Sequence, residues 1–243
     1  MKSILIIGAL SDIGIAIAKK FAVEGYEIHL ASRNSKRLDK IINFFQSNYK
    51  IKTYAYEFDA IKINSHKEFI KQFKILPSIV ICSVGLMGDQ KINEKEKDQR
   101  ISIIRTNFEG PMNVLSEIAN EYEKKEIGTI VGISSVAGER GRAKNYIYGS
   151  AKSGLITFLS GLRNRLAKKN INVITVLPGP VNTKMTSKMK LPKLLTATPE
   201  RVAKDVYDAV IKKKDIIYSL KIWKFIMIIL NLIPEKIFKT KDL

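Results

Sequence analysis

Short apolar runs alternate with helical periodicity along the whole chain. Several runs, such as SIVICSV and NVITVL, are apolar at consecutive positions. Continuous apolar runs are typical of parallel strands covered on both faces. We therefore predict a parallel sheet of seven strands, Ser3–Ile7, Glu27–Ala31, Thr53–Phe58, Ile79–Ser83, Thr129–Ile133, Asn172–Leu177 and Ile216–Ser219.

The segments between these runs have the spacing of amphipathic helices. In IGIAIAKKFAVEG, Ile13, Ile17 and Phe21 recur at about one helical turn, and Gly25 supplies a stop. Right-handed crossovers then predict an α/β fold, a single-domain doubly wound parallel sheet with helices on both faces. Residues 1–220 would form this body, and residues 221–243 an amphipathic C-terminal extension of the same domain. Ligands of such sheets bind at the carboxyl ends of the strands.

The composition supports one ordinary globular core, since 243 residues with 45% apolar and 27% charged residues fit a single domain. Cys82 is the single cysteine, which excludes a disulfide framework and a cysteine-based zinc site. His29 and His66 lack companions that would indicate a metal, so we expect none. The N-terminus lacks the zones of a signal peptide, so we expect a cytoplasmic protein.

The formal charge of +19 is the strongest compositional bias. It favours phosphate-rich partners, but 33 lysines against 9 arginines also fit a genome that fills solvent positions with lysine. The chain lacks helix-turn-helix spacing, zinc-finger spacing and alternating aromatic and basic residues, so we expect no nucleic-acid partner.

Gly8 and Gly14 bracket the turn between the first predicted strand and the first predicted helix. A helix N-terminus presents free N–H groups and a positive dipole end, which suit a pyrophosphate. Ser11, Asp12 and Ile13 would lie beside that anion. Because a carboxylate repels a diphosphate, we expect Asp12 to turn toward the start of the helix and cap it. The spacing departs from G-x-G-x-x-G, so other residues must identify the ligand.

Tyr148 and Lys152 lie four residues apart and therefore on one helix face, with Ser135 upstream at a strand end. A neighbouring ammonium favours the phenolate and is expected to lower the pKa of a tyrosine. Ser135 can hold a substrate carbonyl while Tyr148 donates the proton. Tyr146 has the wrong spacing to Lys152 for this role.

These residues resemble the classical short-chain dehydrogenase/reductase family, whose serine lies thirteen residues before its tyrosine, as Ser135 does before Tyr148. The resemblance implies a Rossmann-type fold, a homo-oligomer, and Asn107 of TNFEG as the fourth catalytic residue. The family's Asn-Asn-Ala-Gly segment is replaced here by CSVG, residues 82–85. The cofactor residues implied by the resemblance are Gly8, Ser11, Asp12, Ile13, Gly14, Asp59, Gly85, Tyr148, Lys152, Pro178, Gly179, Val181 and Thr183.

The cofactor preference is encoded after the second predicted strand. An acidic residue there binds the ribose 2′-hydroxyl of NAD, whereas an arginine accommodates the 2′-phosphate of NADP. The chain has Ser32 and Arg33 at this place. We therefore expect NADP(H) to be preferred over NAD(H), unless Arg33 is only a solvated loop residue.

Within the family, SVGLMGD, SSVAGERGRAKNYIYGSAKSGL and the C-terminal tail resemble reductase components of decaprenylphosphoryl-ribose 2-epimerases. The resemblance implies reduction of a polyprenylphosphoryl 2-keto-pentofuranose to the arabino sugar in cell-envelope precursor synthesis, after oxidation by a separate flavin-dependent partner. A general ketoreductase acting on 3-oxoacyl thioesters is the alternative. A cofactor sensor that kept the fold without catalysis is a third reading.

The tail from Ile222 to Ile233 is apolar except at Lys224 and Asn231, and Pro234 is expected to end its helix. Twelve residues are too few to span a bilayer, which needs about twenty. Residues 221–239 could make a peripheral contact with the inner face of the cytoplasmic membrane or face the substrate. They could equally pack on the protein core or on another subunit.

Arg140, Arg142 and Lys144 precede Tyr148 in the same loop. Two interpretations remain open for this cluster. The three side chains could bind a substrate phosphate, or they could form a solvated loop.

Overall fold

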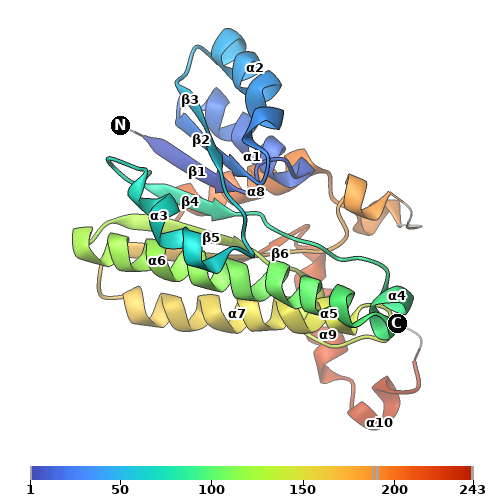
Figure 1. Ribbon diagram of the computed structural model, residues 1–243. Coiled ribbons are helices and arrows are strands. Elements are labelled where there is room, and N and C mark those ends of the chain that lie inside the picture. Colours follow the sequence, from blue (N-terminus) through green and yellow to red (C-terminus); the bar gives the residue numbers. More distant parts are fainter. Residues whose placement is uncertain (1, 188, 190–191, 242–243) are drawn as a thin grey trace.

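The computed structural model describes residues 2–187, 189 and 192–241, and it confirms the predicted sheet. Seven parallel strands are arranged in the order β3-β2-β1-β4-β5-β6-β7 (Figure 1). Their bounds are β1 Ser3–Ile7, β2 Glu27–Ser32, β3 Thr53–Glu57, β4 Ile79–Cys82, β5 Gly128–Ile133, β6 Ile171–Pro178 and β7 Ile216–Ser219.

Several strands end one residue away from the predicted bounds. Phe58 and Ser83 lie just beyond β3 and β4, although their N–H groups still donate to Ser32 O (2.9 Å) and Ile7 O (2.8 Å). One backbone hydrogen bond therefore continues past each strand end before the chain turns away.

Helices cover both faces of the sheet. On one face, α1 (Asp12–Val23), α2 (Asp39–Tyr49) and α8 (Pro199–Ile211) contribute side chains to one apolar cluster. On the other face, α3 (His66–Lys71), α6 (Gly110–Lys125) and α7 (Tyr146–Leu166) contribute to a second cluster. In Figure 1, α6 and α7 run side by side below the sheet. The short helices α4 (Gln90–Lys95) and α5 (Lys97–Ile104) precede α6.

The centre of the sheet determines where a ligand can bind. β1 pairs with both β2 and β4, so the chain leaves β1 and β4 toward opposite faces. Gly8 and Ser83 follow directly after these strands and come into close contact. A Cβ atom on Gly8, which has a φ of +86°, would lie 2.8 Å from Ser83 O. This position therefore requires glycine.

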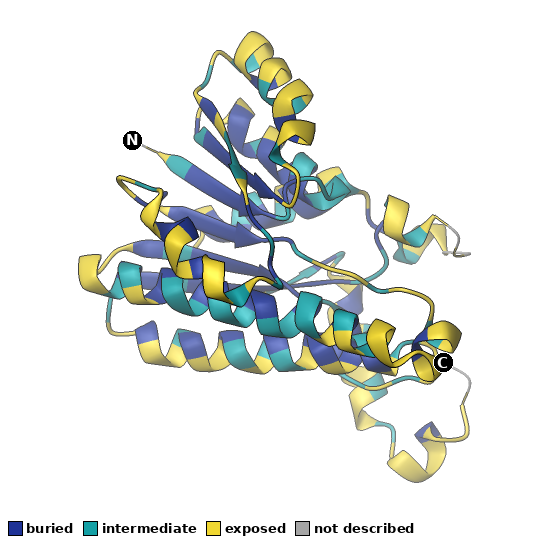
Figure 2. Cartoon of the chain, in the orientation of Figure 1, coloured by how far each residue is buried: buried dark blue, intermediate teal, exposed yellow. Residues whose placement is uncertain are grey.

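The C-terminal segment forms α9 (Ile222–Leu232) and α10 (Glu235–Phe238), with Ile233 extended before Pro234 as expected for a residue preceding proline. Trp223 and Met227 are buried against Val136 and Leu177. Figure 2 shows exposed positions along the same two helices. Within the described ranges, no helix is long and apolar enough to cross a membrane.

His29 and His66, the two histidines of the chain, are both buried. Nδ1 of His29 lies 2.9 Å from the Tyr56 hydroxyl, and its Nε2 lies 3.0 Å from Glu27 Oε1. Burial lowers the pKa of both imidazoles. These contacts give the two side chains structural roles.

Two glycines provide a matched test of the packing. A Cβ on Gly110 would collide with the carbonyl group of Ala60, whereas a Cβ on Gly161 in α7 meets no atom within 4 Å. We expect Gly110→Ala to lower the free energy of unfolding by about 1–3 kcal/mol through overpacking. Gly161→Ala should raise it by up to about 1 kcal/mol through helix propensity. Urea unfolding measures both, and equal effects would contradict the packing of α6 on the loop after β3.

Candidate active site

A cleft of about 650 Å³ opens at the carboxyl ends of the strands. It is lined by loops that follow β1, β2, β3, β4, β5 and β6, and by the first turns of α7. Of the predicted site residues, it brings together Gly8, Ser11, Asp12, Ile13, Arg33, Asp59, Gly85, Ser135, Tyr148, Lys152, Pro178, Gly179, Val181 and Thr183. Gly14 and Asn107 do not line the cleft.

Ser135, Tyr148 and Lys152 share one wall of this cleft. Ser135 follows β5, and its Oγ accepts a hydrogen bond from Ala137 N at 3.1 Å, which fixes its side chain. Tyr148 and Lys152 lie in the first turns of α7, with Lys152 Nζ 5.7 Å from the centre of the Tyr148 ring. The structure therefore assembles the hydroxyl, phenol and ammonium groups as their spacing predicts.

The electrostatics differ from the prediction. Burial raises the pKa of Tyr148 to about 12, although its hydrogen bond with the Ser135 side chain opposes this shift. The prediction that Lys152 lowers this pKa is wrong, because burial dominates. The Lys152 ammonium donates to Ile133 O at 3.1 Å and to Val84 O at 3.4 Å. A phenol with a raised pKa stays protonated, as a proton donor must.

Lys152 is a buried cation, only 2% exposed. Burial lowers its pKa to about 8 because the charged form loses its hydration. Ser134 Oγ donates to the Lys152 carbonyl at 2.9 Å and ties this turn of α7 to the end of β5. The ammonium is thus held in one position beside the phenol.

Asn107 lies in a π-helical turn, Arg105–Glu109, between α5 and α6. Its Nδ2 donates to Leu86 O (2.6 Å) and Ile103 O (2.8 Å), and its Oδ1 accepts from Leu86 N at 3.1 Å. The side chain holds the segment after β4 in place and does not contact Lys152 directly. π-Helical turns are common at functional sites because they re-aim a side chain.

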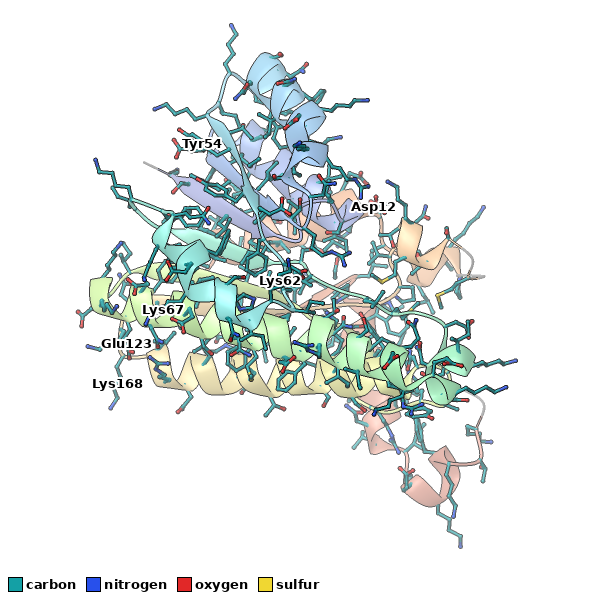
Figure 3. The ribbon with its side chains drawn as sticks, viewed as in Figure 1. Asp12, Tyr54, Lys62, Lys67, Glu123 and Lys168 are labelled. Carbon is teal, nitrogen blue, oxygen red and sulfur yellow. The ribbon has the colours of Figure 1, made fainter. Side chains whose placement is uncertain are left out.

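Ser11, and not Asp12, caps α1. Gly14 N donates to Ser11 Oγ at 3.0 Å, so the prediction that Asp12 turns to cap the helix is wrong. The Asp12 carboxylate instead accepts a hydrogen bond from Lys184 N at 2.7 Å, in the loop after β6. Figure 3 labels Asp12 on the side of the sheet toward this loop. As the first residue of α1, Asp12 points away from the helix axis and toward the opposite lip of the cleft.

Ser83 also contacts the loop after β1, which the sequence did not reveal. Its hydroxyl lies 3.0 Å from Ser11 Oγ, and Ser11 Oγ also donates to Gly8 O at 2.8 Å. Ser83 stands in the segment that departs from the family pattern, and its hydroxyl connects the loops after β1 and β4. The neighbouring Cys82 thiol is buried, and burial raises its pKa.

Two guanidinium groups lie at the end of the cleft beyond β2. Arg33 is exposed there, as predicted, and Arg37, which sequence analysis missed, lines the same end. Ser32 occupies the strand end, and its Oγ donates to Asn34 O at 3.1 Å. Asp59 follows β3, and its Oδ1 accepts from Ile61 N at 3.2 Å. This end of the cleft therefore carries two guanidinium groups, those of Arg33 and Arg37.

The three cations before Tyr148 separate in the structure. Arg140 turns toward the C-terminal helices, where it donates to Leu230 O, pairs with Glu235 at 3.1 Å and stacks 3.7 Å above the Phe238 ring. It does not line the cleft. The hypothesis that all three cations bind a substrate phosphate is therefore wrong for Arg140.

Arg142 and Lys144 do line the cleft. Nε of Arg142 is buried without a hydrogen-bond partner among the described residues, and burial lowers the pKa of this guanidinium. A buried N–H group without a partner favours binding an acceptor from a ligand.

Trp223 completes the wall from α9. Its indole N–H donates to Leu195 O at 2.9 Å, and its ring lies directly against Gly179, where any Cβ would collide with it. The only tryptophan of the chain therefore borders the cleft from α9. Of the alternatives left open for the tail, its inner face thus both packs on the protein core and borders the cleft.

The protein belongs to the short chain dehydrogenase family, whose model matches residues 2–193. It is an NAD(P)-dependent oxidoreductase that acts on CH–OH or C=O groups.

Among its relatives, an uncharacterized oxidoreductase of Mycobacterium tuberculosis is 29% identical over 97% of this chain and 95% of its own length. Carbonyl reductase family member 4 of Xenopus laevis is 29% identical over 83% and 87% of the two chains. A short-chain dehydrogenase from Sphingobium yanoikuyae, solved in complex with NADPH, superimposes with a TM-score of 0.84 at 19% identity over 97% of both chains. The curated relatives thus extend along most of the chain, and the solved structure has the same fold.

The depressed pKa of Lys152 makes stability depend on pH. Between about pH 8 and pH 10.5 the unfolded chain holds a proton that the folded protein has lost, so the free energy of unfolding rises with pH. Lys152→Met removes this contribution. We expect the free energy of unfolding of wild type to rise by on the order of 2 kcal/mol relative to that of Lys152→Met from pH 7 to pH 10. Denaturant unfolding of both proteins measures it, and a difference independent of pH would refute the buried charge.

The Asp12 contact is tested by proteolysis. Asp12→Ala removes the acceptor for Lys184 N, whereas Asp12→Asn keeps an acceptor without the charge. We expect trypsin to cleave after Lys184 about fivefold faster in Asp12→Ala, because one lost hydrogen bond favours local opening. Asp12→Asn should stay near wild type. Mass spectrometry of the fragments gives the rates, and equal rates in both variants would argue against the contact.

Proposed function

We propose that the protein is an NADP(H)-dependent carbonyl reductase in which Ser135, Tyr148 and Lys152 are the catalytic residues. The proposal rests on the placement of these three side chains on one wall of a single cleft at the carboxyl ends of the sheet. When bound, the reduced nicotinamide supplies the hydride. Ser135 donates a hydrogen bond to the substrate carbonyl oxygen, and Tyr148 transfers its phenolic proton to that oxygen.

Lys152 serves this step through its charge. As Tyr148 loses its proton, the ammonium stabilises the phenolate that forms. Asn107 acts as a positioning residue in this proposal, because its hydrogen bonds fix Leu86 and the segment after β4 beside the cleft. Both groups are buried, so their geometry is set before substrate arrives.

The cofactor fits the opposite half of the cleft. Gly8 supplies close backbone approach at the N-terminus of α1, where Ser11, Asp12 and Ile13 would lie beside the pyrophosphate. Gly14 lies behind this lining and packs closely against Gly8 O. Asp59 and Gly85 would lie near the adenosine half. Pro178, Gly179, Val181 and Thr183 would lie near the nicotinamide.

We assign a preference for NADP(H) over NAD(H) to Arg33 and Arg37. Both guanidinium groups lie at the cleft end beyond β2, where a 2′-phosphate would need positive charge. The NADPH bound by the similar Sphingobium enzyme agrees with this assignment.

For the substrate, we propose a polyprenylphosphoryl 2-keto-pentofuranose, reduced to the arabino sugar after a separate flavin-dependent enzyme has oxidised it. Two features of the cleft support a lipid-linked phosphate. Arg142 offers a buried N–H group to an anion. Met185 and Met189, each about half exposed, and Trp223 make part of the lining apolar.

A 3-oxoacyl thioester is the second candidate. The same apolar lining would accept an acyl chain, and the relative named carbonyl reductase supports a broad ketoreductase class. The two candidates differ in the position of a phosphate group. The sugar substrate carries its phosphate on the same ring as the carbonyl that is reduced, whereas a 3-oxoacyl group has none beside its carbonyl.

The first experiment follows NADPH oxidation in detergent with both substrates and identifies the product. We expect Tyr148→Phe to lower kcat about 100-fold or more, because the proton donor is lost. Energy transfer from Trp223 to NADPH should show that the variant still binds cofactor. Tyr146→Phe, two residues away and exposed, is the matched control and should keep its activity.

Arg142→Gln separates the two substrates. It should raise KM about tenfold for the phosphate-linked ketone and leave the thioester unaffected. If only the thioester is turned over, the protein is a general ketoreductase and the proposal of a lipid-linked sugar substrate is wrong. Activity that survives in Tyr148→Phe would remove the proposed mechanism altogether.

A further inference from the structure

The outer face of α9 is an exposed apolar surface that the proposed reaction does not explain. Ile222, Phe225, Ile229 and Leu232 are 49%, 64%, 63% and 76% exposed, and their spacing places them on one side of the helix. Ile228 is exposed next to them. Contiguous exposed apolar residues of this kind mark a surface that meets a partner. Figure 2 shows the exposed positions of α9 and α10 below the body.

This face cannot turn inward, because the inner face of α9 is already fixed. Trp223 and Met227 are buried, and the Trp223 indole donates to Leu195 O. Arg140 donates a hydrogen bond to Leu230 O near the end of α9. Its guanidinium group also pairs with Glu235 and stacks on the Phe238 ring of α10. The body therefore presents the outer face to its surroundings.

The charged residues around the outer face of α9 favour an anionic partner. Glu235 is the only acidic residue between 221 and 241, and it is paired with Arg140. The flanking lysines are all exposed, and they are Lys221, Lys224, Lys236, Lys239 and Lys241. Two copies meeting through this face would bring ten lysines together, two times five, which is unfavourable. An anionic lipid surface would neutralise the same charges.

We propose that the outer face of α9, together with Ile237 of α10, binds the surface of an anionic lipid bilayer. The eleven residues of α9 are too short to span the bilayer, so the helix would lie in its plane. Its apolar side chains would enter the boundary between headgroups and acyl chains, and the lysines would contact lipid phosphates.

The proposal deepens the proposed function, on which its biological use rests. The inner face of α9 carries Trp223 on the cleft wall, and the outer face would rest on lipid. One helix would thus separate the cleft from the bilayer. A lipid-linked ketone could then reach the site with its chain still in the membrane.

Flotation with vesicles tests the binding without cofactor or substrate, so the result does not depend on the proposed reaction. We expect wild type to bind vesicles of phosphatidylcholine with phosphatidylglycerol, and to bind less at high salt or to phosphatidylcholine alone. Phe225→Ser and Leu232→Ser should each weaken binding about tenfold through lost apolar burial. Ile75→Ser is the matched control, since Ile75 is 76% exposed and precedes β4.

Sedimentation analysis of the same variants in solution tests whether a second copy of the protein covers this face instead of a bilayer. Wild type that fails to bind the anionic vesicles would overturn the proposal, as would equal binding by Phe225→Ser and Ile75→Ser. If Phe225→Ser instead dissociates an oligomer, the face is a subunit interface. NADPH oxidation with a water-soluble ketone should stay unchanged in the outer-face variants, which separates this proposal from the catalytic one.

Discussion

The pairing of β1 with β4 is the constraint on which the rest of the structure depends. Ile7 lies opposite Cys82, so the loops after these strands begin at the same level of the sheet. Their contact is possible because Gly8 has no side chain and because Ser11 and Ser83 bond across the gap. The cleft opens at this junction and continues along the carboxyl ends of the neighbouring strands. A doubly wound sheet produces such an opening wherever its winding reverses.

The wall formed by Ser135, Tyr148 and Lys152 is destabilising by itself, because it buries a charged group. Lys152 sits between two backbone carbonyls with little access to water, and Tyr148 stays protonated beside it. The rigid turn of α7 and the end of β5 hold both groups at their positions. Burial thus shifts the pKa values of both groups away from their ordinary values.

The sequence predicted all seven strands and their parallel pairing, because apolar runs covered on both faces have a strong pattern. It also predicted many of the residues that line the cleft, because spacings such as that from Tyr148 to Lys152 can be recognised in a single sequence. It missed Ser83 and Arg37, and it included Gly14 and Asn107, which do not line the cleft. The contacts of Asp12, Arg140 and Trp223 could not be predicted from the sequence. Each has a partner far along the chain, at Lys184, Leu230 and Leu195, and no local pattern encodes such contacts. The Tyr148 pKa likewise depended on burial, which becomes visible only in three dimensions.

The position of β1 also has a consequence for biosynthesis. This strand precedes the other six along the chain, yet it lies near the middle of the sheet and needs β4, about seventy residues later, as one of its two neighbours. Until residues 79–82 emerge, only the β2 side of β1 can pair, and its other edge stays open. An open apolar edge on a nascent chain is a site for mispairing and for chaperone capture. The same junction that forms the cleft can therefore close only after β4 has been synthesised.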